Sequence, residues 1–219
     1  CLAHCFGLPR LSEDLDFVDT NNSVDLDIFA KDLETFFKRK TDLPLSVRRQ
    51  KFRIELKFPI LHELQSDASE TNLLILKVEV FNDFTFCKKY KTEMKPLFKF
   101  NKSMIIKTFD LSTLMSTKIR AVLYRKWEKT NKQGETLISV KGRDYFDLMW
   151  YLQKGIKPNM DCLEISDIES LKEKLLEMVD KLDTSSVVLD LENFIADKTF
   201  VRNLSGSIKD ILKTSINGL

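Results

Sequence analysis

Two aspartates that are separated by a single residue, Asp14 and Asp16, form the first pattern in the sequence that could do chemistry. The run 14–18 alternates polar and apolar residues, which predicts a short β-strand. Both carboxylates would then lie on one face of the strand, roughly 7 Å apart, with Leu15 and Phe17 directed to the core. Adjacent carboxylates repel each other unless a cation neutralises them, and oxygen ligands suit Mg²⁺. The spacing therefore indicates a candidate magnesium site.

A second strand, expected over residues 73–81, carries Lys77 and Glu79 on one face. An acid beside a lysine within an apolar strand is costly unless the pair is used or neutralised. If a neighbouring strand brings Glu79 against Asp14 and Asp16, the three carboxylates could hold a pair of Mg²⁺ ions on a triphosphate. The alternative is that the Asp-x-Asp spacing arises by chance and that Lys77 and Glu79 are ordinary charges of an edge strand.

Two charged residues stand on faces of expected helices that are otherwise apolar. Lys118 either extends its ammonium group to solvent over a packed stem or binds a phosphate group. Asp144 shares its face with apolar residues and is difficult to explain as a surface residue. Arg143 and Asp147 are four residues apart, so a surface ion pair is sufficient to explain them.

The elements that must position these residues change in type along the chain. Alternating and apolar runs predict strands over residues 14–18, 52–58, 73–81 and 104–109. Apolar stripes at helical spacing predict helices over residues 24–40, 110–129, 141–153, 164–182, 187–197 and 205–215. The expected fold class is α+β, with a mixed β-sheet core over residues 1–109 followed by a helical C-terminal domain over residues 110–219.

Composition restricts the class of protein. The 219 residues are 43% hydrophobic and 31% charged, which permits a sizeable core and excludes a globally disordered chain. No apolar run approaches the roughly 18 residues of a membrane span, and no signal peptide is visible, so we expect a cytoplasmic protein without membrane contact. The four cysteines include no CxxC pair, which predicts reduced thiols rather than a zinc site. Because the chain begins at Cys1 rather than at a methionine, we expect it to be a fragment or to lack its first residues.

Charge is unevenly distributed although the net charge is only +2. Residues 88–107 carry seven lysines and one acid, and residues 161–183 carry eight acids and three lysines. The basic segment is the candidate surface for a nucleic acid, with Phe84, Phe86 and Tyr90 as candidate stacking residues. The alternative is that both segments are ordinary solvated surfaces.

Four parts of the sequence resemble, in order, the motifs of one protein family. They are Phe6-Gly7-Leu8-Pro9-Arg10 with Ser12-Glu13-Asp14-Leu15-Asp16-Phe17, Leu76-Lys77-Val78-Glu79-Val80, Lys118-Ile119-Arg120-Ala121, and Lys141-Gly142-Arg143-Asp144-Tyr145-Phe146-Asp147-Leu148. The family is that of the AbiEii/AbiGii-type nucleotidyltransferase toxins of type IV toxin–antitoxin and abortive-infection systems. The resemblance spans about residues 1–155. A Gly-Gly-Ser/Thr run opens the first motif in the family, and we expect it before Cys1.

The resemblance implies a nucleotidyltransferase-fold enzyme that moves an NMP from an NTP to an acceptor and releases pyrophosphate. In that case Asp14, Asp16 and Glu79 would bind Mg²⁺. Lys118 and Asp144 would complete the catalytic set.

The resemblance further places Arg10, Ser12, Lys77 and Arg143 among the nucleotide-binding residues. It implies an NTP such as GTP as the substrate, tRNA as a candidate acceptor and a cognate antitoxin as the partner protein. Two alternatives stay open. One is a toxin on the same fold that binds an NTP or phosphorylates a protein, and the other is a non-catalytic binding module.

Overall fold

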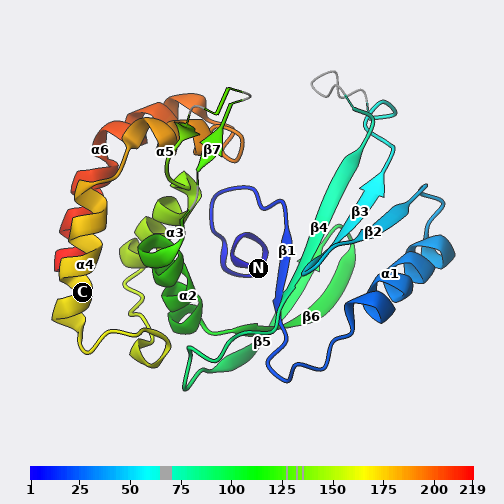
Figure 1. Cartoon of the computed structure of the whole chain (residues 1–219), viewed down its shortest axis with the longest axis horizontal. Coiled ribbons are helices and arrows are strands. Elements are labelled where there is room, and N and C mark those ends of the chain that lie inside the picture. Colours follow the sequence, from blue (N-terminus) through cyan, green and yellow to red (C-terminus); the bar gives the residue numbers. More distant parts are fainter. Residues whose placement is uncertain (65–70, 127, 132, 135) are drawn as a thin grey trace. The chain divides into compact units, whose positions relative to one another are not determined.

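The computed structural model describes residues 1–64, 71–126, 128–131, 133–134 and 136–219 (Figure 1). The chain divides into two compact units. Residues 12–85 form the sheet unit, and residues 1–11 together with residues 86–219 form the helical unit. The boundary expected between residues 109 and 110 marks the point where strands give way to helices. That it is also a boundary between domains stays a prediction.

The sheet unit is built on a mixed sheet of four strands. In their order across the sheet, the strands are β1 (Leu15–Val18), β4 (Leu74–Phe81), β3 (Arg53–Phe58) and β2 (Ser46–Arg49). Strand β1 runs parallel to β4, whereas β4 and β3, and β3 and β2, are antiparallel. Strand β4 is therefore an inner strand, as its apolar start predicted.

One helix covers one face of this sheet. Helix α1 (Leu26–Lys40) begins after Asp25, whose carboxylate accepts hydrogen bonds from the backbone N–H groups of Asp27 and Ile28. The helix packs on β2 and β3, beside which it lies in Figure 1. The buried core of the unit consists of Ala30, Ile54, Leu56, Phe58 and Val78. Because side chains alternate across a strand, the charged residues of β3 and β4 lie on the other face of the sheet.

The helical unit begins with a single π-helical turn, η1 (Leu2–Phe6). Its strands are β5 (Thr92–Lys99) and β6 (Lys102–Phe109), which form a hairpin, and the short pair β7 (Lys129–Thr130) and β8 (Thr136–Ile138). Its helices are α2 (Leu111–Tyr124), α3 (Gly142–Gln153), η2 (Met160–Cys162), α4 (Ile168–Asp180), α5 (Thr184–Leu191) and α6 (Lys198–Asn217). None of the described helices is both long and apolar enough to cross a membrane. A mixed sheet followed by helices confirms the expected α+β class.

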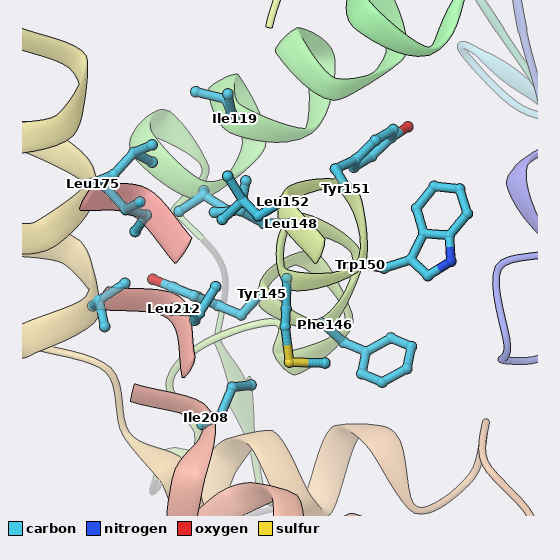
Figure 2. Close-up of a cluster of buried hydrophobic side chains, with 14 of the residues drawn as sticks. Ile119, Tyr145, Phe146, Leu148, Trp150, Tyr151, Leu152, Leu175, Ile208 and Leu212 are labelled. Carbon is cyan, nitrogen blue, oxygen red and sulfur yellow. The ribbon is translucent and has the colours of Figure 1, made fainter. Parts of the chain in front are cut away.

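Helix α3 is the central element of the helical unit. Ten of its twelve residues are buried, and α2, α5 and α6 pack against it. Figure 2 shows Ile119, Leu175, Ile208 and Leu212 of the neighbouring helices around the side chains of α3. At its first turn the helix approaches α5 so closely that a Cβ atom on Gly142 would lie 2.7 Å from the Cα atom of Val187. Close packing thus fixes the position of α3.

Several elements differ from those expected. The sequence did not predict β2 or β5. Strand β2 is a short strand at the edge of the sheet. Strand β5 contains Pro96, a residue that argues against a strand but is tolerated in a two-stranded ribbon. Helix α2 ends at Tyr124 rather than near residue 129, because residues 129–130 pair with β8. Helix α6 runs without a break through Gly206, where an added Cβ atom would meet open space.

The expectation that Leu15 and Phe17 point into the core is wrong. Their side chains are 41% and 48% exposed. The reason is that β1 is an edge strand, whereas α1 packs on β2 and β3 at the opposite edge.

The expectation of reduced thiols is contradicted for two of the four cysteines. Cys87 and Cys162 form a disulfide across a sequence separation of 75 residues, and Cys1 and Cys5 are free. The backbone N–H of Lys88 donates a hydrogen bond to the carbonyl oxygen of Asp161, so the two segments that carry the disulfide lie side by side. A pairing this distant in sequence has no local signal.

Candidate active site

The sheet unit carries three of the expected carboxylates, those of Asp14, Asp16 and Glu79, on or next to its paired strands β1 and β4. Because β1 and β4 are paired in parallel, Asp16 lies opposite Glu79, and Asp14 lies two residues before Asp16. Burial raises the pKa of Glu79, and the charges of Asp16 and Asp14 raise it further, against the opposing effect of Arg53 and Lys77. The register thus sets Asp16 beside Glu79, and the charges of Asp16 and Asp14 both act on the Glu79 carboxylate.

Two cations lie beside these carboxylates. Lys77 Nζ is 3.8 Å from Asp14 Oδ1, and Arg53 Nη1 is 3.8 Å from Glu79 Oε1. In this arrangement, no three His, Cys, Asp or Glu side chains among the described residues converge as a metal site requires. The carboxylate oxygens are the kind of ligand that Mg²⁺ prefers. In this structure, Lys77 and Arg53 offset the negative charge of the carboxylates that a bound metal ion would otherwise offset. The metal-binding role of Asp14, Asp16 and Glu79 therefore stays a prediction.

Strand β3 adds charged residues that the sequence analysis missed. Glu55 is buried, accepts a 2.7 Å hydrogen bond from Gln50 Nε2 and lies 3.3 Å from Lys57 Nζ. Arg53 lies 3.4 Å from the same carboxylate. The available signal was the strict alternation of residues 53–58, which indicated a half-buried strand without indicating what its polar face contacts. The charged face therefore extends across β1, β4 and β3.

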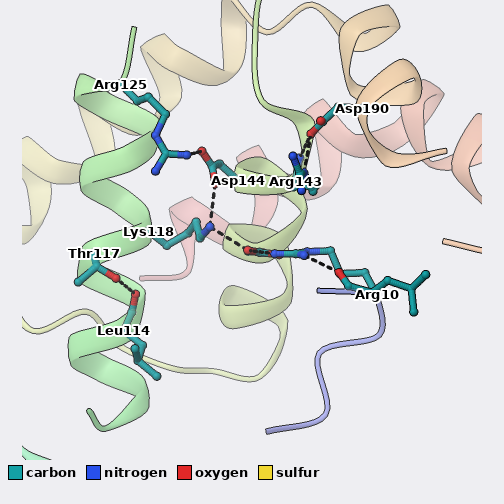
Figure 3. Close-up of polar contacts among 10 residues, drawn as sticks. Arg10, Leu114, Thr117, Lys118, Arg125, Arg143, Asp144 and Asp190 are labelled. Carbon is teal, nitrogen blue, oxygen red and sulfur yellow. Dashed lines mark hydrogen bonds and ion pairs between the residues drawn. The ribbon is translucent and has the colours of Figure 1, made fainter. Parts of the chain in front are cut away.

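A second charged cluster lies between helices α2 and α3 in the helical unit. Lys118 Nζ is 2.7 Å from Asp144 Oδ1 and 2.9 Å from Asp147 Oδ2. Arg125 donates a 2.8 Å hydrogen bond to the other oxygen of Asp144. Arg10 donates two hydrogen bonds to Asp147, at 2.6 and 2.7 Å. Figure 3 shows Lys118 of α2, and Arg125 directly after the end of α2, reaching toward Asp144, so Lys118 and Asp144, the two helical residues singled out from the sequence, are in direct contact.

Burial and charge act in opposite directions on the pKa values in this cluster. Burial alone would lower the pKa of Lys118, but the charges of Asp147 and Asp144 raise it above its ordinary value. Burial alone would raise the pKa of Asp144, but Lys118 and Arg125 hold it below its ordinary value. Lys118 and Asp144 are therefore both charged at neutral pH. Three cations face two carboxylates, which leaves the cluster with one positive charge in excess.

The expected surface ion pair of Arg143 and Asp147 is wrong. The side chain of Asp147 is fully buried, and it binds Arg10 and Lys118. Arg143 donates to Asp190 of α5 through its backbone N–H at 2.9 Å and its Nε at 3.3 Å, and its guanidinium lies 3.8 Å from the ring centroid of Phe194. Arg143 thus holds the start of α3 against the segment that contains α5.

The other residues expected to bind nucleotide or nucleic acid have varied surroundings. Ser12 is exposed and belongs to the sheet unit, whereas Arg10 belongs to the helical unit. Phe84 is buried and offers no face to a base, which corrects its selection as a stacking residue. The ring of Phe86 is already covered by the guanidinium of Arg120, at 4.1 Å.

Comparison of the chain with models of protein families identifies its family. The family model of the nucleotidyl transferase AbiEii toxin of type IV toxin–antitoxin systems matches residues 1–211. The chain belongs to this family. The match covers both units, so the AbiEii family predicted from the motifs and the nucleotidyltransferase-type fold are both confirmed. Membership of a toxin–antitoxin family also implies a cognate antitoxin as partner. No match was found among curated proteins.

Proposed function

We propose that this AbiEii-family protein transfers an NMP from an NTP to an RNA acceptor with the help of Mg²⁺. The observation that supports the proposal is the pairing of β1 and β4, in which Asp16 lies opposite Glu79, with Asp14 two residues earlier in the chain. Oxygen donors from adjacent strands are the ligand chemistry that Mg²⁺ prefers. When bound there, Mg²⁺ would offset the negative charge of the phosphates.

In the proposed reaction, the oxygen of an acceptor hydroxyl forms a bond to the α-phosphorus of the NTP. The bond from the α-phosphorus to the bridging oxygen breaks, and pyrophosphate leaves. Glu79 accepts the hydroxyl proton, and the upward shift of its pKa suits a general base. Within the helical unit, Lys118 is the proposed phosphate-binding residue, and its 2.7 Å contact with Asp144 orients the ammonium group.

Four further residues are proposed to contact the nucleotide, namely Arg10, Ser12, Lys77 and Arg143. Each of the two arginines is paired with a buried carboxylate, so its guanidinium is already oriented before substrate binds. Lys77 and Ser12 lie in the sheet unit, which also carries the three carboxylates. Preorientation of this kind lowers the entropic cost of binding an anion.

The β5–β6 hairpin is the proposed contact surface for a tRNA acceptor. The side chains of Phe98 and Phe100 are 75% and 92% exposed, Lys99 lies between them in the sequence, and Lys102 follows two residues after Phe100. Exposed aromatic rings beside lysines suit the stacking of unpaired bases and the attraction of phosphates. This surface includes part of the basic segment 88–107 that the sequence singled out.

A transfer assay tests the proposed function. Purified protein is incubated with Mg²⁺, total tRNA and each labelled NTP in turn, and labelled RNA is separated on a gel. We expect labelling with at least one NTP, and its loss in Asp16→Asn. Asp32→Asn is the matched control, because Asp32 is an exposed aspartate of α1 in the same unit. Equal labelling by Asp16→Asn and the wild type would contradict the proposal.

A further inference from the structure

A cavity of about 460 Å³ opens in the helical unit beside Asp144. Its walls come from the end of α2, the segment before α3, the first turn of α3 and one residue of α4. Volumes of about 300–1,000 Å³ are typical of small-molecule sites. Neither the motifs nor the family match assigns a role to its basic residues Arg125, Lys126 and Lys141.

The charges that line this cavity are not balanced. Each oxygen of Asp144 is already in contact with a cation, Oδ1 with Lys118 and Oδ2 with Arg125. In the described part of the chain, no carboxylate lies within ion-pair distance of Lys141 Nζ. Glu128, the other acid of the lining, lies near Thr136, whose hydroxyl donates to it at 3.3 Å. The cavity therefore presents a partly buried ammonium group without a partner anion.

The electrostatic surroundings of Lys141 support this description. Burial lowers the pKa of Lys141, and the nearby cations Arg143, Arg125 and Lys118 lower it further, against the opposing charge of Asp144. A bound anion would relieve this repulsion. The lining also contains apolar side chains, among them Val122 and Met178, which suit the uncharged part of an organic ligand.

We propose that this cavity binds the polyphosphate chain of a nucleotide, with Lys141 and Arg125 as the phosphate ligands. Arg125 is suited to this role because its guanidinium is held by Asp144 while its side chain remains 41% exposed. The inference rests on the proposed function, because it names two residues of the helical unit that bind the phosphates of the NTP. The backbone phosphates of RNA are a second source of the same chemistry, and the experiment separates the two.

Calorimetric titration with inorganic tripolyphosphate tests the inference directly, without any transfer reaction. We expect Lys141→Gln and Arg125→Gln each to weaken binding about ten- to a hundred-fold, since each removes a charge-assisted contact. Lys174→Gln is the matched control, because it removes the same charge from an exposed position of α4. Lys141→Arg should retain most of the affinity. Lys141→Gln should melt no lower than the wild type, because Lys141 is held in an environment unfavourable to its charge.

The possible outcomes are distinct. Unchanged tripolyphosphate affinity in both cavity variants would overturn the inference, whatever the transfer assay shows. Weakened affinity in a protein that transfers no nucleotide would support the inference and count against the proposed function instead. A single-stranded oligonucleotide without a 5′-phosphate is titrated in parallel. If the cavity variants weaken only its binding and the wild type does not bind tripolyphosphate, the nucleotide assignment is overturned.

Discussion

Replacing Lys118 by methionine separates the structural role of the α2–α3 charge cluster from a role in catalysis. Methionine keeps an unbranched apolar stem, so the packing of a side chain that is only 18% exposed is preserved. Asp144 keeps its contact with Arg125, and Asp147 keeps its two hydrogen bonds from Arg10. Neither buried carboxylate is left without a cation.

The expected loss of stability follows from the contacts that are removed. The substitution removes two charge-assisted contacts, at 2.7 and 2.9 Å, and such contacts contribute about 1.5–3 kcal/mol each. It also removes a buried ammonium group, whose desolvation costs several kcal/mol. We expect a net loss of about 1–3 kcal/mol, and a decrease in Tm of about 2–12 °C for a protein of this size. Asp147→Ala should cost more, about 3–5 kcal/mol, because it leaves Arg10 without its bidentate partner.

Thermal unfolding followed by circular dichroism, combined with the transfer rate per folded molecule, measures both effects. If Lys118 binds phosphate, Lys118→Met should reduce the transfer rate by about 10²–10³ while melting well above Asp147→Ala. The reasoning is refuted if Lys118→Met melts as low as Asp147→Ala and its folded fraction transfers at the wild-type rate. The cluster would then be purely structural.

Three further predictions concern other parts of the molecule. The pKa of Glu79 is raised in the folded state, so the ionised carboxylate destabilises the fold at a pH above that pKa, and this cost disappears as the pH falls through it. Glu79→Gln should therefore raise the Tm at about pH 7 but not at about pH 3.5. The same substitution should abolish transfer. Gly142→Ala should destabilise the protein by about 1–3 kcal/mol in urea unfolding because its Cβ would meet the backbone of α5, whereas Gly206→Ala, which meets open space, should stabilise it by about 0.5–1 kcal/mol. Changing the three lysines of residues 88–91 to glutamate should weaken tRNA binding and reduce its salt dependence in filter binding; an affinity of the wild type that does not vary with salt would indicate a protein acceptor instead.

Local sequence patterns predicted the parts of the fold that depend on local physics. The alternation of residues 53–58 and the helical stripe of residues 164–182 both correspond to observed elements, β3 and α4. The spacing of Asp14 and Asp16 predicted which side chains share a face. It could not predict that β1 would be an edge strand, because that depends on which segments pair with it. This is why the two apolar residues of β1 proved to be exposed.

The charge cluster was predictable only in part for a similar reason. An apolar stripe interrupted by Lys118, and a charged residue on the inner face of α3, indicated that each needed a partner. The motif context then suggested that Lys118 and Asp144 belong together. Asp147 was assigned to the surface because the partner four residues away, Arg143, is local, whereas its true partner Arg10 is 137 residues away. Contacts between such distant residues are set by tertiary packing and leave no local pattern.

The distance of Arg10 from Asp147 has a consequence for the order in which the protein can form during its synthesis. Arg10 is made early, but the chain then builds the whole of the sheet unit before it returns to the helical unit at residue 86. Asp147, the carboxylate partner of Arg10, becomes available only after α3 has emerged from the ribosome. Since α5 and α6 also pack on α3, the helical unit cannot be completed until nearly the whole chain has emerged. A translation product that is interrupted before α3 would therefore contain Arg10 and Lys118 but neither of the carboxylates that hold them.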